Sequence, residues 1–183
     1  VYSWTDMIDQ AVIAQFQKET GITVHMSYFE NNKELFVKMQ ATRGAGFDLI
    51  VPSDYMVPAL IEDGLIKQLA AEKITILSSI HPALVNREFD PGSLYTVPYC
   101  WSIYGIGIDT AFFSTLPEPS WKLLFNAEGA QPYRVGMINE PREALLIAAQ
   151  YLFGTIDNLS RDQYRQIQQL LIKQKKQVAV YAD

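Results

Sequence analysis

Two short segments in the first half of the chain combine an aromatic ring, a hydroxyl group and a carboxylate. They are Trp4, Thr5 and Asp6, and Ser53, Asp54 and Tyr55. An aromatic face beside a carboxylate suits an organic ammonium ligand, because the ring attracts the cation while the carboxylate accepts charge-assisted hydrogen bonds. Simpler interpretations stay open: Asp6 and Asp54 could cap helices, and Trp4 could belong to the core.

A third acidic pair lies in the second half, where Glu140 and Glu143 flank Pro141 and Arg142. Proline at this point predicts the start of a helix, and Glu143 stands where a capping-box carboxylate belongs. Capping alone therefore explains the pattern. The functional hypothesis is that one or both carboxylates face a cationic ligand at the start of the helix, where the helix dipole also favours negative charge.

Other chemistry is poorly supported by the sequence. His25 and His81 are far apart and lack a metal-ligand spacing, so we expect no metal site. Gly105 and Gly107 lack the third glycine of a dinucleotide fingerprint, and we expect no cofactor. Cys100 could act as a nucleophile if a base folded against it, but the sequence favours a buried, inert thiol.

Composition excludes several classes of protein. The chain has 183 residues, of which 49% are hydrophobic and 19% charged, which indicates a globular fold rather than disorder. Its net charge of −5 argues against nucleic acid as a partner. The longest uncharged run, residues 91–108, is interrupted by prolines and glycines, so we expect no transmembrane helix.

Strand-like and helix-like segments alternate along the chain, which predicts an α/β fold with an open parallel sheet. We expect strands at 1–4, 22–28, 47–51, 134–138 and 177–181, helices at 9–20, 32–39, 54–63, 120–125, 141–153 and 160–175, and extended segments at 95–99 and 102–108. In such a sheet the carboxyl ends of the strands share one edge. Residues 4–6 and 53–55 both follow a predicted strand, so we expect them to meet there.

The two parts of the chain differ in charge. Residues 1–109 hold 7 basic and 13 acidic residues, whereas residues 110–183 hold 8 and 7. We therefore predict a first α/β lobe over 1–109 and the beginning of a second over 110–183, with the boundary at Asp109.

Five motifs occur in order: YSWTD at 2–6, FQKETGI at 16–22, FDLIVPS at 47–53, VPYCW at 97–101 and GIG at 105–107. Together they resemble the spermidine/putrescine-binding proteins of bacterial polyamine ABC importers. The resemblance implies a periplasmic, non-enzymatic binding protein with two α/β lobes joined by crossing strands. Such a protein closes on a polyamine and delivers it to membrane permease subunits.

The resemblance also implies roles for residues. Trp4 corresponds to an aromatic wall, Thr5 and Asp6 to polar and ionic contacts, Ser53 and Tyr55 to contacts from the same lobe, and Glu140 and Glu143 to the anionic contribution of the second lobe. Family chains run well past residue 183 and return to the first lobe, so we expect an incomplete second lobe, weak or no binding, and self-association through exposed apolar surface.

Three residues depart from the family pattern. Met7 stands where an aromatic residue is usual, Ser3 stands where Asn is usual, and Asp54 lies inside the Ser53 loop. Because a flexible thioether cannot fix an amine as a phenol does, Met7 leaves the ligand open. Another small organic cation or an amino-acid derivative, an enzyme on the same fold that uses Cys100, and a sensory domain without transport are the alternatives.

Overall fold

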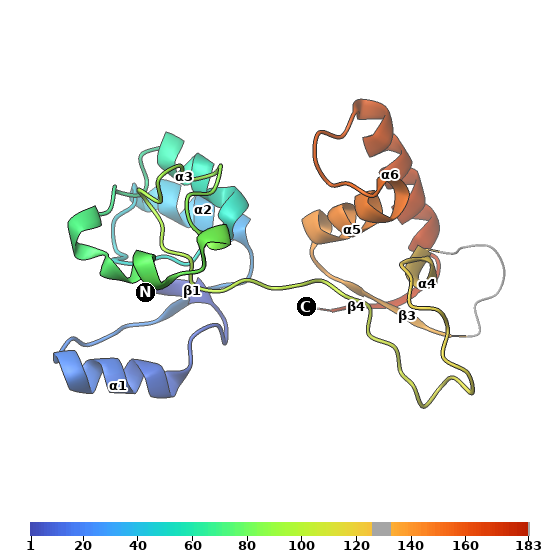
Figure 1. Cartoon of the computed structure of the whole chain (residues 1–183), viewed down its shortest axis with the longest axis horizontal. Coiled ribbons are helices and arrows are strands. Elements are labelled where there is room, and N and C mark those ends of the chain that lie inside the picture. Colours follow the sequence, from blue (N-terminus) through green and yellow to red (C-terminus); the bar gives the residue numbers. More distant parts are fainter. Residues whose placement is uncertain (126–132, 183) are drawn as a thin grey trace. The chain divides into compact units, whose positions relative to one another are not determined.

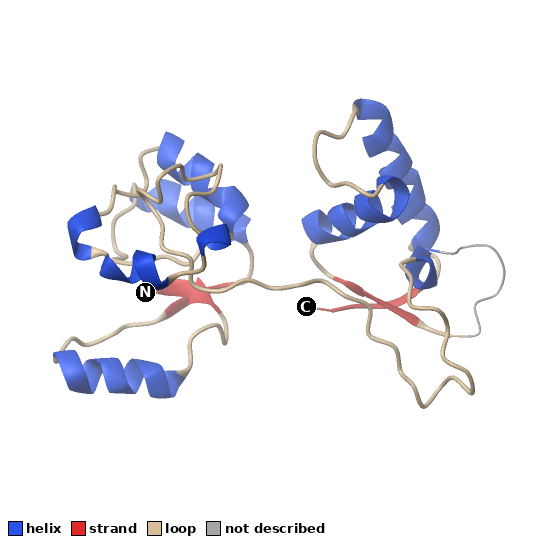
Figure 2. Cartoon of the chain, viewed as in Figure 1, coloured by secondary structure: helices blue, strands red, loops and turns tan. Residues whose placement is uncertain are grey.

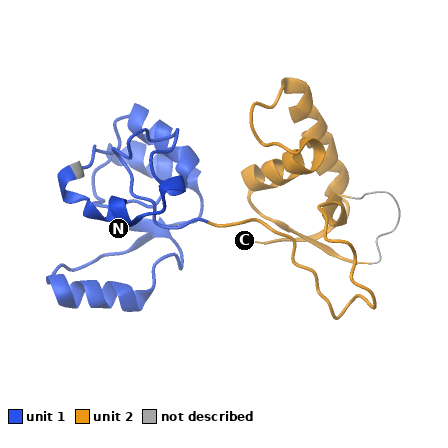
Figure 3. Ribbon diagram, viewed as in Figure 1, with its two compact units in different colours: residues 1–101 blue, residues 102–183 orange. Residues whose placement is uncertain are grey.

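The computed structural model describes residues 1–125 and 133–182 of the chain. The chain divides into two compact units, residues 1–101 (unit 1) and 102–183 (unit 2) (Figure 3). The boundary at Asp109, which rests on a change in charge, stays a prediction. Both units combine helices with parallel strands (Figure 2), so the predicted α/β class is confirmed.

Unit 1 is built on short parallel strands. Strand β1 (Tyr2–Trp4) pairs in parallel with β2 (Ser27–Phe29) along its whole length. On the other edge of β1, the amide of Tyr2 donates to Leu49 O and the amide of Val51 donates to Tyr2 O, both at 2.9 Å. β1 therefore lies between the two other segments.

The helices of unit 1 follow the strands in the predicted order. They are α1 (Gln10–Thr20), α2 (Asn32–Thr42) and α3 (Val57–Glu62), the last preceded by a 3-10 turn, η1 (Asp54–Met56). Figure 1 shows α1 on the opposite side of the strands from α2 and α3. None of the 11 residues of α1, all of which the structure describes, is buried. Its apolar residues Val12 and Phe16 are 58% and 43% exposed.

Local signals set the ends of these helices. The Asp9 side chain accepts from the amide of Ala11 and caps α1, and Gly21 ends it in the left-handed conformation at φ 73°. Gly44, after α2, also has a positive φ, and a Cβ atom there would lie 2.6 Å from Leu65 O. Glycine is therefore required at this close approach between two loops.

The core of unit 1 lies between the strands and α2 and α3. Its buried members are Tyr2, Phe29, Leu35, Met39 and Leu60. The Tyr2 ring stacks on Phe47 at 4.5 Å and meets Phe29 edge-on at 5.0 Å. Leu35 and Leu60 are fully buried, and burial of such a side chain contributes about 1.5–3 kcal/mol.

Residues 65–101 contain only short 3-10 turns among the elements that the structure describes there, η2 (Ala71–Lys73), η3 (Thr75–Ser79) and η4 (Pro82–Leu84). Asp90 organises this region: it is 2% exposed, and its carboxylate accepts hydrogen bonds from the backbone amides of residues 94–96 and from Thr96 Oγ1. Such a fully bonded buried carboxylate fixes the loop that leads to residues 97–101.

Unit 2 has a second parallel pair of strands. Its elements are α4 (Lys122–Phe125), β3 (Val135–Ile138), α5 (Pro141–Phe153), α6 (Arg161–Gln174) and β4 (Val178–Ala182). β3 pairs in parallel with β4. The buried core is formed by Phe125, Met137, Ile147, Ala148, Ala149 and Ile167. Gln174, 1% exposed, donates to Leu124 O at 3.1 Å and ties the end of α6 to α4.

The strands differ most from their predicted extents. The predicted strand at 22–28 is reduced to β2, and the one at 47–51 to a single bridge between Tyr2 and Ile50. The extended segments predicted at 95–99 and 102–108 are present without strand pairing in the described residues. A strand exists only where a partner completes its hydrogen bonds, and β1 offers just three residues.

Candidate ligand-binding site

Three segments of unit 1 leave the parallel strands at the same edge. β1 ends at Trp4, β2 ends at Phe29, and the bridge at Ile50 is followed by Pro52 and Ser53. Because the three segments run parallel, their carboxyl ends gather at one edge of the sheet. Hydrogen bonds join Asn32 to Ser53 and Tyr55, and the topology places residues 4–6 at the same edge of the sheet.

Trp4 and Asp6, at this edge of the sheet, differ in exposure to solvent. The Trp4 ring is half-buried and packs against Phe29, with ring centroids 4.7 Å apart and an interplanar angle of 58°. Thr5 and Asp6 are exposed, and Asp6 adopts a left-handed backbone conformation at φ 58°. The cap of α1 is Asp9, so the capping interpretation of Asp6 is wrong. Asp6 is left as an exposed carboxylate two residues after the half-buried Trp4.

Ser53 and Tyr55 are joined by a residue that the sequence did not single out. Asn32, at the start of α2, donates from Nδ2 to Ser53 Oγ and to the Tyr55 hydroxyl, each at 2.9 Å. Its Oδ1 atom accepts from the Ser53 amide, also at 2.9 Å. Asp54 is exposed and accepts from the neighbouring amide of Tyr55 at 2.7 Å. The Ser53 and Tyr55 oxygens are therefore held by one amide group.

A distant segment reaches the loop after β1. The Tyr99 hydroxyl donates to the backbone carbonyl of Met7 at 3.1 Å, and the Cys100 thiol lies 3.5 Å from the Met7 sulfur. The thiol is exposed, so the expectation of a buried cysteine is wrong, whereas the expectation of an inert thiol stays a prediction. The neighbouring aromatic residues are exposed as well, Tyr99 by 58% and Trp101 by 67%.

The acidic pair of unit 2 lies at the start of α5. Glu140 occupies the N-cap position but makes no side-chain cap hydrogen bond within the described part of the chain. Glu143 is 12% exposed and forms an ion pair with Arg142 at 3.0 Å. The capping-box interpretation is therefore wrong for this pair. The two carboxylates differ: Glu143 already has a cation beside it, whereas Glu140 is not used in capping.

Tyr104 is a further neighbour of the unit 2 carboxylates. Partial burial, followed by the charge of Glu143 and a side-chain hydrogen bond to it, raises the pKa of Tyr104 above its ordinary value. A carboxylate stabilises a neutral phenol that donates to it and opposes loss of the phenol proton. Tyr104 is thus a hydrogen-bonding neighbour of Glu143. No motif in the sequence marks this pairing, because 39 residues separate the two and neither lies in a shared pattern.

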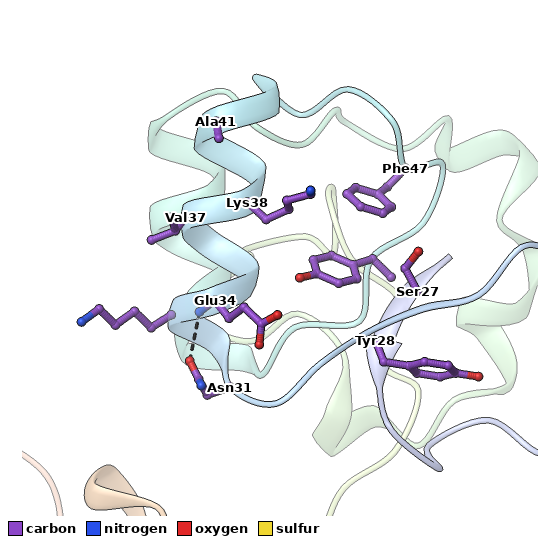
Figure 4. Close-up of a pocket in the computed structure, with 10 residues that line it drawn as sticks. Ser27, Tyr28, Asn31, Glu34, Val37, Lys38, Ala41 and Phe47 are labelled. Atoms are coloured by element: carbon purple, nitrogen blue, oxygen red, sulfur yellow. Dashed lines mark hydrogen bonds between the residues drawn. The ribbon is translucent and has the colours of Figure 1, made fainter.

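A separate groove of about 700 Å³ crosses unit 1 between α2 and β2. Figure 4 shows Lys38 and Phe47 lining the groove. It also shows the Asn31 side chain, which lines the groove as well and accepts a hydrogen bond from the Glu34 amide. Burial, and then the charge of Glu34, raises the pKa of Tyr2 in this groove. None of the described residues that line the groove is among the predicted ligand contacts.

Two absences concern the described residues only. Within residues 1–125 and 133–182, no group of three or more His, Cys, Asp and Glu side chains is arranged to hold a metal ion. No helix in the same part of the chain is long and apolar enough to cross a membrane.

Two α/β units, with Trp4 and Asp6 at the carboxyl ends of the parallel strands of the first, are compatible with the two-lobed fold of solute-binding proteins. The sequence matches the family of bacterial extracellular solute-binding proteins over residues 11–183. The chain therefore belongs to that family.

Particular relatives carry the comparison further. The spermidine/putrescine-binding periplasmic protein of Escherichia coli is 33% identical over 127 residues, which cover 69% of this chain and 36% of the relative. The putrescine-binding periplasmic protein SpuD of Pseudomonas aeruginosa is 30% identical and is covered over 50% of its length, against 94% of this chain. The chain thus spans half or less of the length of these relatives.

Solved structures agree on the fold. The spermidine/putrescine ABC transporter substrate-binding protein PotD of Streptococcus pneumoniae has a TM-score of 0.76 at 27% identity, over 98% of this chain and 55% of the other. The TpPotD lipoprotein of Treponema pallidum has a TM-score of 0.89 at 22% identity, over 100% and 57%. The predicted periplasmic-binding-protein fold is confirmed, and the predicted family resemblance with it.

Proposed function

We propose that the chain belongs to the ligand-binding component of an importer and that it captures a diamine or polyamine. The observation that carries the proposal is the cluster at the carboxyl edge of unit 1. It presents a partly exposed Trp4 ring, an exposed Asp6 carboxylate and two fixed hydroxyl groups, those of Ser53 and Tyr55. Relatives whose names include spermidine and putrescine support the choice of ligand.

The chemistry of this cluster fits an alkylammonium group. A protonated amine has only donors, so it needs acceptors, and carboxylate and hydroxyl oxygens supply them. The methylene chain of a polyamine can pack on the Trp4 ring, whose face also attracts the positive charge. A neutral or anionic solute of the same length would gain neither the ionic contact nor the cation–π attraction.

Unit 2 would contribute charge of its own. We assign the direct ionic contact there to Glu140, because Glu143 is already paired with Arg142 and bonded by Tyr104. Glu143 adds a longer-range negative potential at the start of α5. Ligand contacts from both units would stabilise a closed state relative to an open one, which is how a solute-binding protein couples capture to closure.

The names of the relatives support the proposed location and partners. The periplasm is the proposed compartment and permease subunits of an ABC transporter are the proposed partners, and no covalent step is required. An enzyme that uses Cys100 is disfavoured, because a nucleophilic thiol needs a base and the described partner of this thiol is the Met7 thioether, which accepts no proton at neutral pH.

Thermal unfolding with a panel of solutes tests the proposal. Putrescine and spermidine at 100 times their dissociation constant should raise the unfolding temperature by about 5–10 °C. Butane-1,4-diol has no ammonium group, and glutamate carries carboxylates beside its ammonium group. Both solutes should therefore leave the unfolding temperature unchanged. Other organic cations and amino-acid derivatives belong in the panel because Met7 replaces an aromatic residue. Stabilisation by one of these, and none by polyamines, would overturn the polyamine assignment.

A further inference from the structure

Asn32 is a buried polar residue whose side chain performs no local task. It is 3% exposed and stands directly after the N-cap of α2. The capping function belongs to Asn31, whose Oδ1 atom accepts from the Glu34 amide at 3.0 Å. The Asn32 side chain instead reaches residues 21 and 23 positions further along the chain. A buried amide committed to distant partners has a role in the tertiary structure of the edge.

The three hydrogen bonds of Asn32 define a geometry. A carboxamide has two N–H donors on one nitrogen, and here one nitrogen donates to two different oxygens, Ser53 Oγ and the Tyr55 hydroxyl. The amide oxygen holds the Ser53 backbone at the same time. Both hydroxyl oxygens therefore lie at a fixed distance from a common atom, and their separation is set by the planar amide rather than by free side-chain rotation.

We propose that Asn32 is a positioning residue, which fixes the Ser53 and Tyr55 oxygens so that both can face one ammonium group of the ligand. The inference rests on the proposed function and adds to it the residue that preorganises the site. An ammonium group donates in directions fixed by its tetrahedral geometry, so acceptors that are already spaced for it bind without the entropic cost of being ordered. Asn32 acts through the two hydroxyl groups and does not itself touch the ligand.

Titration of spermidine into a set of variants tests this role. The variants are made in two parent proteins, the 183-residue chain and the longest natural protein whose sequence includes it. Asn32→Ala should weaken binding by about tenfold in the parent. In a Ser53→Ala/Tyr55→Phe background the same substitution should weaken binding by less than about twofold, because no hydroxyl pair is left to position. A residue that supports only the stability of unit 1 would show the same loss in both backgrounds.

Asn31→Ala is the matched control. It removes the cap of α2 and should lower the unfolding temperature, with equal and small effects on affinity in both backgrounds. If Asn32→Ala does not fold, Asn32→Ser replaces it, because one hydroxyl proton cannot serve two acceptors at once.

The outcomes separate the two proposals. Equal losses in the two backgrounds, or no loss in the parent, would overturn the positioning role while leaving polyamine binding intact. If spermidine binds to neither parent protein, the proposed function is overturned, and the positioning role with it.

Discussion

Replacement of Asp90 should reveal how much of unit 1 depends on one buried carboxylate. Its oxygens accept from the amides of Leu94, Tyr95 and Thr96 at 3.0, 3.1 and 2.8 Å, and from Thr96 Oγ1 at 2.7 Å. A hydrogen bond to a charged group contributes about 1.5–3 kcal/mol, and a donor left without a partner in a buried site costs about 1–3 kcal/mol. Because Leu94 is 40% exposed, water can reach part of the freed segment and reduce the loss.

We therefore expect Asp90→Ala to lower the free energy of unfolding by about 3–5 kcal/mol, because several donors lose their partner and water satisfies only part of them. Urea unfolding followed by circular dichroism measures this change, and hydrogen exchange should show faster exchange of the amides of residues 94–96. Asp48→Ala, which removes an exposed carboxylate of the same unit, should change stability by less than about 0.5 kcal/mol. A loss below about 1 kcal/mol for Asp90→Ala would refute the idea that its hydrogen bonds hold the loop.

Three further predictions follow from individual contacts. Tyr99→Phe removes the hydrogen bond to the Met7 carbonyl. We expect titration to show a two- to tenfold loss of spermidine affinity, and urea unfolding to show a loss of under about 1 kcal/mol of stability. Unchanged affinity would show that this hydrogen bond does not hold the loop after β1. Cys100 should react with a thiol reagent in the folded protein, since it is exposed, and bound spermidine should slow the reaction; labelling only after denaturation would contradict the structure. The raised pKa of Tyr104 means that its contribution to stability is present below the ordinary value of 10.0 and is lost as pH rises through the higher folded-state pKa. Stability of the parent should therefore fall more steeply above about pH 10 than that of Tyr104→Phe, and equal slopes in alkaline urea unfolding would contradict the link to Glu143.

Local signals in the sequence were sufficient for the helices. Asp9 and Gly21 bound α1 as predicted, and Ser160 forms the capping box of α6. These helix ends depend on residues within one or two turns of each other, so they can be predicted from short stretches of the sequence. Strand lengths were not predictable in the same way, because they depend on how many residues a distant partner offers.

The candidate site was predicted in part for the same reason. Residues at the ends of β1 and of the 47–51 segment could be placed at one edge from topology alone. Asn32 was missed as a site residue because asparagine at the start of a helix is usual, whereas its partners lie 21 and 23 positions away. The exposure of Cys100 was missed because a free cysteine is usually buried, whereas here it lies beside Tyr99, which donates to the Met7 carbonyl, in an exposed segment.

Self-association stays a prediction. Apolar side chains are exposed in both units, among them Val12 on α1 and Ile172 on α6, at 58% and 61%. Scattered exposed residues are common in monomers, and only a contiguous patch would favour an interface.

The central claim is that Asp6 and its neighbours bind an ammonium group, and calorimetric titration tests it most directly. Spermidine is titrated into the parent, Asp6→Asn and the control Asp48→Asn, at low and moderate salt, using the 183-residue chain and the longest natural protein that contains it. The account predicts that Asp6→Asn weakens binding by about ten- to a hundredfold, that Asp48→Asn does not, and that salt weakens binding to the parent. Equal affinity of the parent and Asp6→Asn, or no binding to either parent protein, would contradict it.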